Sequence, residues 1–220
     1  MLVSAKSEKT LRSHRTRLSS QQRRSQILQT AIKLFAERGF RGTTTRELAN
    51  AAGVTEPVLY QHFKTKRDLY GAIIERKSQE GQEKFESRLA PYLARGDDVG
   101  YFRTLAELIL EHFAEDPAFA RLFLFSALER HELARLFYER HIQCFQQLIS
   151  GYIRDRAKSK FLRRVDAQTA GCAFLGMVTR YGNMSVLFNE PLGRKRIKKI
   201  SAIVVDIFMN GIAPGRKGRQ

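Results

Sequence analysis

The sequence predicts an all-α protein of about nine helices, in which three helices form a small N-terminal unit and longer helices form the rest. Three observations support this fold class. Hydrophobic residues return every three or four positions along most of the chain, and residues typical of helix ends separate these stretches. No alternation with a period of two persists anywhere. At 220 residues, the chain is long enough for one large or two small domains with a hydrophobic core.

The composition indicates the compartment and the class of partner. The formal net charge is +17, and residues 1–70 hold 14 Lys and Arg but only 5 Asp and Glu. Such a positive surface favours a polyanion, because its phosphates release condensed counterions on binding. Cys144 and Cys172 are too few for a disulfide framework, and no apolar run is long enough for a secretory signal or a membrane span. We therefore expect a cytoplasmic protein that does not use a membrane.

The first segment, residues 1–18, is predicted to be a flexible basic arm. It contains five cationic residues among Ser and Thr and shows no helical periodicity. Two interpretations stay open for it. The arm is either a disordered tail or a segment that lies along DNA or enters a minor groove.

The first helix is expected from Gln22 onwards. Ile27, Ala31, Leu34 and Phe35 follow helical spacing, and charged residues stand between them. Gly39 should end this helix, since glycine readily adopts the conformation required just past a helix C-terminus. Phe40 would then fold back onto Phe35.

Two short helices and a long one should follow. Thr44 and Glu47 are spaced as a capping box that opens the second helix, and Gly53 ends it. Thr55 is predicted to be the N-cap of the third helix, with Leu59 and Phe63 facing inward. Thr65 and Asp68 form another capping signal that begins the long fourth helix.

The second and third helices have the dimensions of a helix-turn-helix, whose second helix enters a DNA major groove. Residues 27–70 read ILQTAIKLFAERGFRGTTTRELANAAGVTEPVLYQHFKTKRDLY. This run resembles the N-terminal domain of the tetracycline-repressor (TetR) family. The resemblance closely covers about a fifth of the chain. It implies a DNA-binding domain over residues 19–70, an effector-binding and dimerisation domain over residues 71–220, and a regulator that binds double-stranded DNA.

The expected DNA contacts fall into two groups. Base edges would be met by Glu56, Pro57, Val58 and Gln61, because Gln suits adenine and apolar groups suit thymine methyls. Pro57 departs from the family, in which many members carry glycine, and this makes base contacts carried over from them less certain. The resemblance assigns the DNA backbone to Thr44, Thr45, Thr55, Tyr60, His62, Lys64 and Lys66. Arg46 would reach either a phosphate or a groove edge.

The C-terminal part should consist of helices separated near residues 91–98, 115–117, 156–161 and 189–193. The family typically encloses a small-molecule pocket with such helices, and an apolar pocket would suit a hydrophobic effector. Most of the large apolar residues here must be plain core. The candidates for the pocket wall are Phe113, Phe123, Tyr138, Phe145, Phe174, Met177 and Tyr181.

One seam near the C-terminus suggests an interface. Five residues alternate in steps of three and four, namely Ile197, Ile200, Val204, Ile207 and Gly211. In the family the last two helices of each subunit form a four-helix dimer interface, so the resemblance implies a homodimer through this seam and the helix over residues 166–188. The alternative to this interface is an intramolecular core seam.

Enzymatic chemistry is not indicated. His141 and Cys144 share a helix face but have no further catalytic partner, and His131-Glu132 does not extend to a metal-binding HExxH motif. We expect no catalytic residue, no metal and no cofactor. The main alternative function is an architectural nucleic-acid-binding protein that does not read sequence. A membrane-surface role for the basic residues 194–199 ranks third.

Overall fold

The computed structural model describes residues 18–128, 132–162 and 164–212. These residues form ten α-helices and one π-helical turn, with no strand among them, which confirms the all-α fold. The helices are α1 (Ser20–Arg38), α2 (Thr45–Ala51), α3 (Glu56–His62), α4 (Lys66–Arg95), α5 (Asp98–Glu115), α6 (Pro117–Leu128), α7 (Glu132–Phe137), α8 (Gln143–Lys158), α9 (Ala167–Leu187) and α10 (Arg194–Ile212). The π-helical turn η1 (Tyr138–Ile142) lies between α7 and α8.

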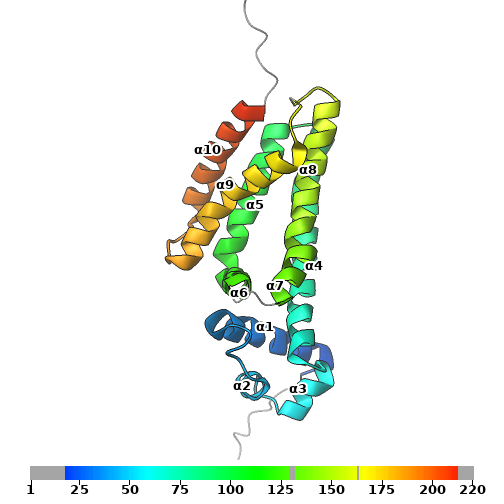
Figure 1. Cartoon of the computed structure of the whole chain (residues 1–220), viewed down its shortest axis with the longest axis vertical. Helices are drawn as coiled ribbons and strands as arrows, with labels where there is room; N and C mark the ends of the chain where they lie inside the picture. Colours follow the sequence, from blue (N-terminus) through cyan, green and yellow to red (C-terminus); the bar gives the residue numbers. More distant parts are fainter. Residues whose placement is uncertain (1–17, 129–131, 163, 213–220) are drawn as a thin grey trace, which may run out of the picture.

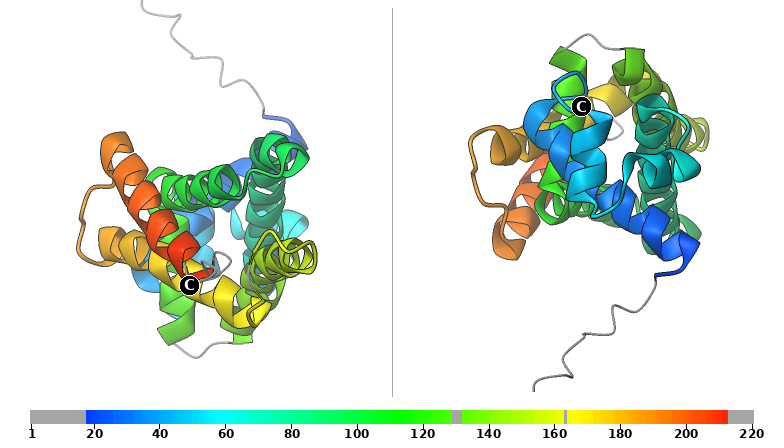
Figure 2. Two further views of the ribbon diagram at one scale, coloured as in Figure 1. Left: turned by 90° about the horizontal axis from the view of Figure 1, so that it is seen from above. Right: turned by 90° about the horizontal axis from the view of Figure 1, so that it is seen from below.

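The molecule is elongated, with α1, α2 and α3 at one end (Figure 1). The long helix α4 leaves this end and runs beside α5 and α8 in the larger body. Seen along the long axis, the helices of the body form a bundle, with α9 and α10 on one side of it (Figure 2). Because α4 belongs to both parts, a movement of the body can be transmitted to the small end.

Two hydrophobic cores hold these parts together. The first joins α1, α2, α3 and the start of α4, and it also includes Phe119 and Leu122 of α6. The second fills the body between α4, α5, α8, α9 and α10. The hydroxyls of Tyr70 in α4 and Ser126 in α6 share a buried hydrogen bond of 2.6 Å, which fixes α6 against the root of α4.

Two helix boundaries differ from the sequence-based expectation. Helix α4 continues past Pro91 to Arg95, and Gly96, at φ +64°, ends it in the left-handed region that favours glycine. Leu89 is buried in the body core, and that packing holds the end of α4 in place around the proline. Between residues 117 and 156, where no break was predicted, the structure has α6, α7, η1 and α8.

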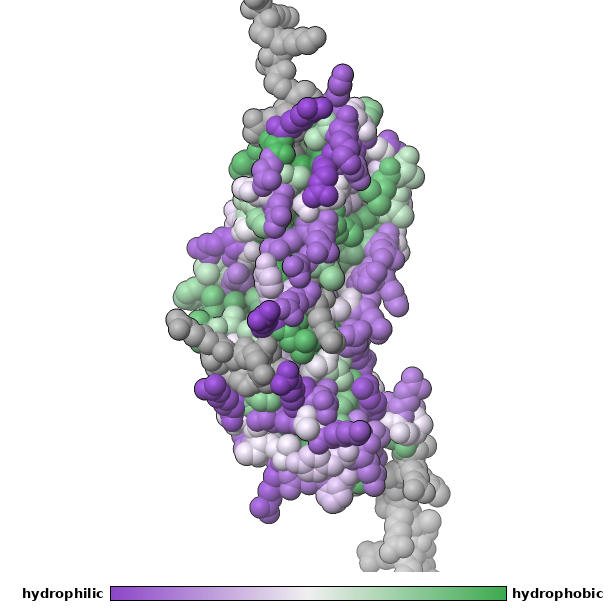
Figure 3. Space-filling model, turned by 45° about the vertical axis from the view of Figure 1, so that its right-hand side comes forward, coloured by the Kyte–Doolittle hydropathy of each residue, from purple (hydrophilic) through white to green (hydrophobic). Residues whose placement is uncertain are grey.

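The surface has a different character at the two ends. On the face seen in Figure 3, the small end carries hydrophilic or neutral side chains almost throughout, whereas hydrophobic patches lie on the larger body. No helix in the described part of the chain is long and apolar enough to cross a bilayer. The predicted basic arm falls on residues 1–18, of which only Leu18 lies within the described residues.

Candidate nucleic-acid interface and ligand cavity

The sequence around α1, α2 and α3 fixes the position of α3. Gly39 has φ 73° and ends α1, and Phe40 folds back so that its ring centroid lies 5.6 Å from that of Phe35. Thr44 caps α2 through a reciprocal box with Glu47, and a 2.8 Å ion pair ties Glu47 to Arg38 at the end of α1. The hydrogen bonds from Thr44 and the nearby Arg38 lower the pKa of Glu47. The predicted helix ends are thus confirmed here.

Helix α3 lies on the outside of the small end. Leu59 is buried against α1 and α2, and Phe63 follows it into the same core. The opposite side faces solvent: Pro57, Tyr60 and Gln61 are exposed, while Glu56, Val58 and His62 are partly exposed. Thr55 stands at the N-cap position as expected, although its side chain makes no capping hydrogen bond. An exposed helix anchored on one side is what insertion into a major groove requires.

A chain of hydrogen bonds sets the angle between α2 and α3. The Thr45 hydroxyl donates to Glu56 Oε1 at 2.8 Å, and the Tyr60 hydroxyl donates to Thr45 Oγ1 at 3.3 Å. These three residues were all expected to contact DNA directly. In this structure their polar groups also hold the two helices of the motif together, so each side chain is placed before any DNA arrives.

Lys66 lies in a different place from the one expected. Its Nζ donates to the carbonyl oxygens of Phe40 at 2.7 Å and Thr43 at 2.8 Å, and it lies 4.2 Å from the centre of the Phe40 ring. The ammonium group therefore closes the loop between α1 and α2. Capping signals do not reveal this contact, because its partners lie 26 and 23 residues away.

The exposed charges at this end are mainly positive. Arg46 at the start of α2 and Lys64 after α3 are both exposed. Arg41, which the sequence reasoning did not single out, is also exposed in the loop that precedes α2. Exposed guanidinium and ammonium groups that flank a protruding helix can reach the phosphates on either side of a groove.

The body contains a cavity of about 410 Å³ between α4, α5, α6, η1, α8 and α9. This volume lies within the range of about 300–1,000 Å³ that is usual for small-molecule sites. Most of its wall is aromatic or aliphatic. The lining residues are Gly81, Phe85, Ile109, His112, Phe113, Phe119, Ala120, Phe123, Tyr138, Ile142, Phe145, Gln146, Cys172, Leu175, Gly176, Thr179 and Asn183.

Four of the seven predicted wall residues line this cavity: Phe113, Phe123, Tyr138 and Phe145. The other three do not. Phe174 is fully buried in the body core, where its ring contacts Phe102 and Phe208 at centroid distances of 5.0 and 5.1 Å. Met177 packs beside that core, and Tyr181 lies 39% exposed on the surface. Helix α9 turns a different stripe toward the cavity.

That stripe consists of Cys172, Leu175, Gly176, Thr179 and Asn183. Its spacing of three and four is typical of one helix face, so the periodicity of α9 contained this signal. The three residues of α9 that were predicted for the wall lie elsewhere on the helix: Phe174 and Met177 face the core, and Tyr181 is exposed. Gly182 allows α9 to pack closely against α5 here, because a Cβ at this position would clash with the Phe113 ring.

His112 is the cavity residue that sequence reasoning most clearly missed. It lies near the end of α5, with its ring centroid 5.7 Å from that of Phe119. Burial lowers the pKa of His112, because the apolar surroundings disfavour the charged imidazolium. The neutral ring therefore faces the cavity, and it can both donate and accept a hydrogen bond.

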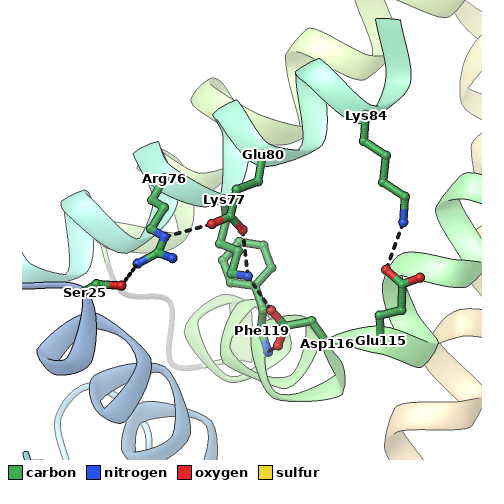
Figure 4. A network of polar contacts seen from close by, with 8 residues as sticks. All are labelled: Ser25, Arg76, Lys77, Glu80, Lys84, Glu115, Asp116 and Phe119. Atoms are coloured by element: carbon green, nitrogen blue, oxygen red, sulfur yellow. Dashed lines mark hydrogen bonds and ion pairs between the residues drawn. The ribbon is translucent and has the colours of Figure 1, made fainter. Parts of the chain in front are cut away.

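A polar network runs from the rim of the cavity to α1 (Figure 4). Asp116, between α5 and α6, accepts a 3.1 Å hydrogen bond from the Phe119 backbone and forms a 2.8 Å ion pair with Lys77 of α4. Lys77 also pairs with Glu80, which pairs with Arg76, and Arg76 donates to the Ser25 hydroxyl of α1 at 2.6 Å. Burial acts to lower the pKa of Lys77, but hydrogen bonds to Asp116 and Glu80 outweigh it and raise the pKa.

The predicted dimer seam on α10 is mostly an internal contact. Ile197, Ile200 and Val204 are 5%, 8% and 4% exposed and belong to the body core, as the intramolecular alternative proposed. Ile207 is 59% exposed, and Ile203, which was not predicted, is 48% exposed on the same face. Gly211 lies in the last turn of α10. Of the two residues on the hydrophobic face that α10 leaves open, Ile207 thus belongs to the predicted seam and Ile203 does not.

Comparisons with known proteins divide the chain in the same way. Residues 27–73 match the model of bacterial regulatory proteins of the tetR family, and residues 102–211 match the C-terminal domain of AefR-like transcriptional repressors. A curated relative, the transcriptional regulator AcrR of Shigella flexneri, is 36% identical over 100 residues, which is 44% of each chain. The chain spans less than half the length of the first curated relatives that it matches.

Solved structures share the fold over most of the chain. A protein of Mesorhizobium loti described as a TetR-family transcriptional regulator superposes with a TM-score of 0.72 at 19% identity, over 90% of this chain and 100% of its own. AibR, solved with isovaleryl coenzyme A and operator DNA, superposes with a TM-score of 0.60 at 23% identity, over 84% and 97% of the two chains. At these identities, the likeness concerns the fold alone.

Proposed function

The chain belongs to the TetR family of transcriptional regulators, and from this premise we propose that it is a homodimer that binds an inverted-repeat DNA operator. In this proposal, the protein releases the operator when a small hydrophobic ligand fills the cavity. Repression is the family's common mode, and we propose it for this chain. The single observation that carries the proposal is the exposed helix α3, fixed by its own hydrogen bonds at the end of the molecule opposite the large body.

In this proposal each subunit places α3 in the major groove. Gln61, together with Pro57 and Val58, faces the base edges, while Arg41, Arg46 and Lys64 contact the phosphates. The remaining predicted contacts, Thr44, Thr55 and His62, lie along the same exposed surface. Glu56, Thr45 and Tyr60 act mainly by holding α3 at its angle.

Dimerisation would use the open face of α9 and α10. Ile203 and Ile207 on α10 are hydrophobic and exposed, as is Tyr181 on α9, and this combination favours burial against a second copy. A two-fold dimer would set its recognition helices about 34–36 Å apart, the spacing of successive major grooves. The operator should therefore be an inverted repeat.

The ligand would act by changing that spacing. If it binds better to a subunit conformation in which the two α3 helices no longer match successive grooves, it draws the population away from the DNA-bound form. A coupling of about 1–3 kcal/mol is typical of such systems. AibR has been solved with both a coenzyme A thioester and operator DNA, and this supports a fold that can accommodate both kinds of partner.

The test is selection of bound duplexes from a random pool, followed by titration of the selected duplex. We expect an inverted repeat that binds at least about a thousandfold more tightly than random duplex at physiological salt. An architectural protein would enrich no sequence and bind both duplexes alike, and that result would refute the proposal.

A further inference from the structure

The described residues that line the cavity combine an apolar wall with a few neutral polar groups. Among the described residues that line it, none is Asp, Glu, Lys or Arg. Phe85, Phe113, Phe119, Phe123 and Phe145 contribute aromatic rings to the wall, and Ile109, Ile142 and Leu175 contribute aliphatic side chains. A ligand here would exchange water for hydrocarbon over most of its surface.

Four charged residues that are close in sequence to lining residues of α4, α5 and α6 form ion pairs with one another. Asp116 and Lys77 form an ion pair of 2.8 Å, and Lys84 and Glu115 form another of 2.9 Å. Asp116 also accepts from the Phe119 backbone. Neither pair lines the cavity, so neither provides a free charge against which a ligand ion could be neutralised.

The wall nevertheless offers neutral hydrogen-bonding groups. Gln146 accepts from the Tyr138 hydroxyl at 3.3 Å, and its amide nitrogen can still donate. Thr179 donates to the carbonyl of Leu175 at 2.8 Å, and its oxygen can still accept. Asn183, on the same stripe of α9, provides both a donor and an acceptor.

We propose that this cavity selects an uncharged, predominantly hydrophobic molecule that carries one or two hydrogen-bonding groups, and that it rejects carboxylates, phosphates and ammonium ions. The proposal rests on the proposed function only for the statement that the ligand controls DNA binding. The physical reason is desolvation. An ion that enters a low-dielectric site loses its hydration without compensation unless a counter-charge lies beside it, whereas a neutral oxygen needs only one hydrogen-bond partner.

The volume and the wall composition also favour a compact ligand with rings. At about 410 Å³ the cavity lies near the lower end of the range for ligand sites. Aromatic walls make edge-to-face and offset contacts with ring systems, and these add to the effect of burial. A bicyclic aromatic compound with a single hydroxyl group is therefore a suitable probe.

The test compares matched ligands that differ only in charge. Isothermal titration at neutral pH would measure 1-naphthol, 1-naphthoate and 1-naphthylmethylammonium with the full-length protein, followed by the equivalent biphenyl and decalin series. We expect the neutral member of a series to bind at least about tenfold more tightly than either ion, a difference of about 1.4 kcal/mol. A carboxylate or an amine that binds as tightly as its neutral analogue, or no binding by any neutral member, would overturn the proposal.

The two cysteines of the chain test whether the ligand binds in the cavity. Both thiols are exposed, but Cys172 of α9 lines the cavity whereas Cys144 of α8 is not among the described lining residues. A ligand in the cavity should protect Cys172 from iodoacetamide and leave Cys144 unprotected, as read by mass spectrometry. Protection of neither thiol, or of both equally, would place the ligand elsewhere and overturn the assignment.

Two substitutions make the charge argument explicit. Asn183→Lys places a cation in the wall and should reverse the preference, so that 1-naphthoate binds more tightly than 1-naphthol. Ser87→Lys adds the same charge to an exposed position of α4 outside the cavity and should leave the preference unchanged. If Asn183→Lys fails to fold, the wild-type ligand series still decides the proposal.

The outcomes separate this inference from the proposed function. If neutral ligands bind in the cavity but leave the operator complex intact, the ligand class stands and ligand-controlled release is refuted. If only an anionic ligand binds and releases the operator, release stands and the ligand class is overturned.

Discussion

At the residue scale, Gln61 and Lys64 are expected to have separable roles in DNA binding. Both are exposed, but Gln61 lies on α3 whereas Lys64 follows it. Gln61→Ala should relax base preference at one operator position by about 1–3 kcal/mol, because it removes hydrogen bonds to a base edge. Lys64→Ala should weaken all duplexes alike and reduce the salt slope by about one. Titration of both variants against operator and random duplex, at several salt concentrations, would measure this.

Identical effects of the two variants on operator and random duplex would contradict these roles. Unchanged base preference in Gln61→Ala would remove Gln61 from the recognition surface. The salt slope provides an internal control, because it depends on the number of phosphates neutralised and not on base identity.

Lys66 is expected to matter for stability more than for DNA contact. Its Nζ holds two backbone carbonyls at 2.7 and 2.8 Å. Lys66→Met should lower the free energy of unfolding by about 1–3 kcal/mol, because hydrogen bonds from a charged donor are lost and the carbonyls lose their partner. Urea unfolding would measure it. The exposed neighbour provides the control, since Lys64→Met should change stability by less than about 0.5 kcal/mol; equal effects would contradict the role of Lys66.

His112 should make the protein less stable in mild acid. Burial lowers the pKa of His112 below its usual value of about 6.5, although the nearby Asp116 and Glu115 favour the charged form. As the pH falls through that value, the unfolded chain takes up the proton first, so the free energy of unfolding falls. His112→Gln removes this titration. Urea unfolding between about pH 7.5 and 5.5 should show a steeper loss in the wild type than in the variant, and parallel curves would contradict the prediction.

At the element scale, α4 is the connection between cavity and DNA-binding helices. The polar network fixes it to the junction of α5 and α6 through Asp116 and to α1 through Arg76. The backbone N–H of Phe119, at the cavity wall, donates a hydrogen bond to Asp116. A ligand that displaces the start of α6 would therefore move Asp116 and, through Lys77, α4. The energetic coupling between ligand and operator measures whether this route is used.

Lys77→Met is the variant that tests this route. The ligand should bind with nearly unchanged affinity, but its effect on operator affinity should shrink by about tenfold, or about 1.4 kcal/mol of coupling. Asp116→Asn should act in the same way, and the double variant should add little. Lys84→Met, which breaks a pair further along α4 with Glu115, is the matched control. An equal loss of coupling in Lys84→Met would contradict the specific role of Lys77.

At the scale of the whole molecule, the exposed hydrophobic face of α10 should decide the oligomeric state. Ile203→Glu together with Ile207→Glu places two carboxylates on that face and should yield monomers in sedimentation velocity. Operator affinity should fall by about 100-fold or more, because linking two binding units gains a factor of about 10²–10⁴. Lys198→Glu is the control, because it also introduces a carboxylate but at an exposed polar position on the other side of α10. Dimers that persist in the double variant would refute this interface.

Much of the small domain could be predicted from the sequence because its signals are local. Gly39, the Thr44–Glu47 box and the Thr65–Asp68 cap act between residues no more than four apart, and the structure reproduces each of them. The alternation of buried and exposed positions also placed Leu59 and Phe63 inside and Gln61 outside. Helical periodicity and capping chemistry thus determined the fold class, the order of the first helices and the exposed side of α3.

Only the tertiary structure decided which face of each long helix meets which neighbour. A seam of apolar residues on α10 looks the same whether it packs on α5 or on a second subunit, and the structure buries Ile197 and Ile200 in the subunit's own core. Phe174 was likewise predicted for the cavity wall but lies in the core, whereas Asn183, which the sequence analysis did not single out, lines the cavity. Such choices depend on contacts between residues distant in sequence, and a local pattern contains no information about the partner that will cover it.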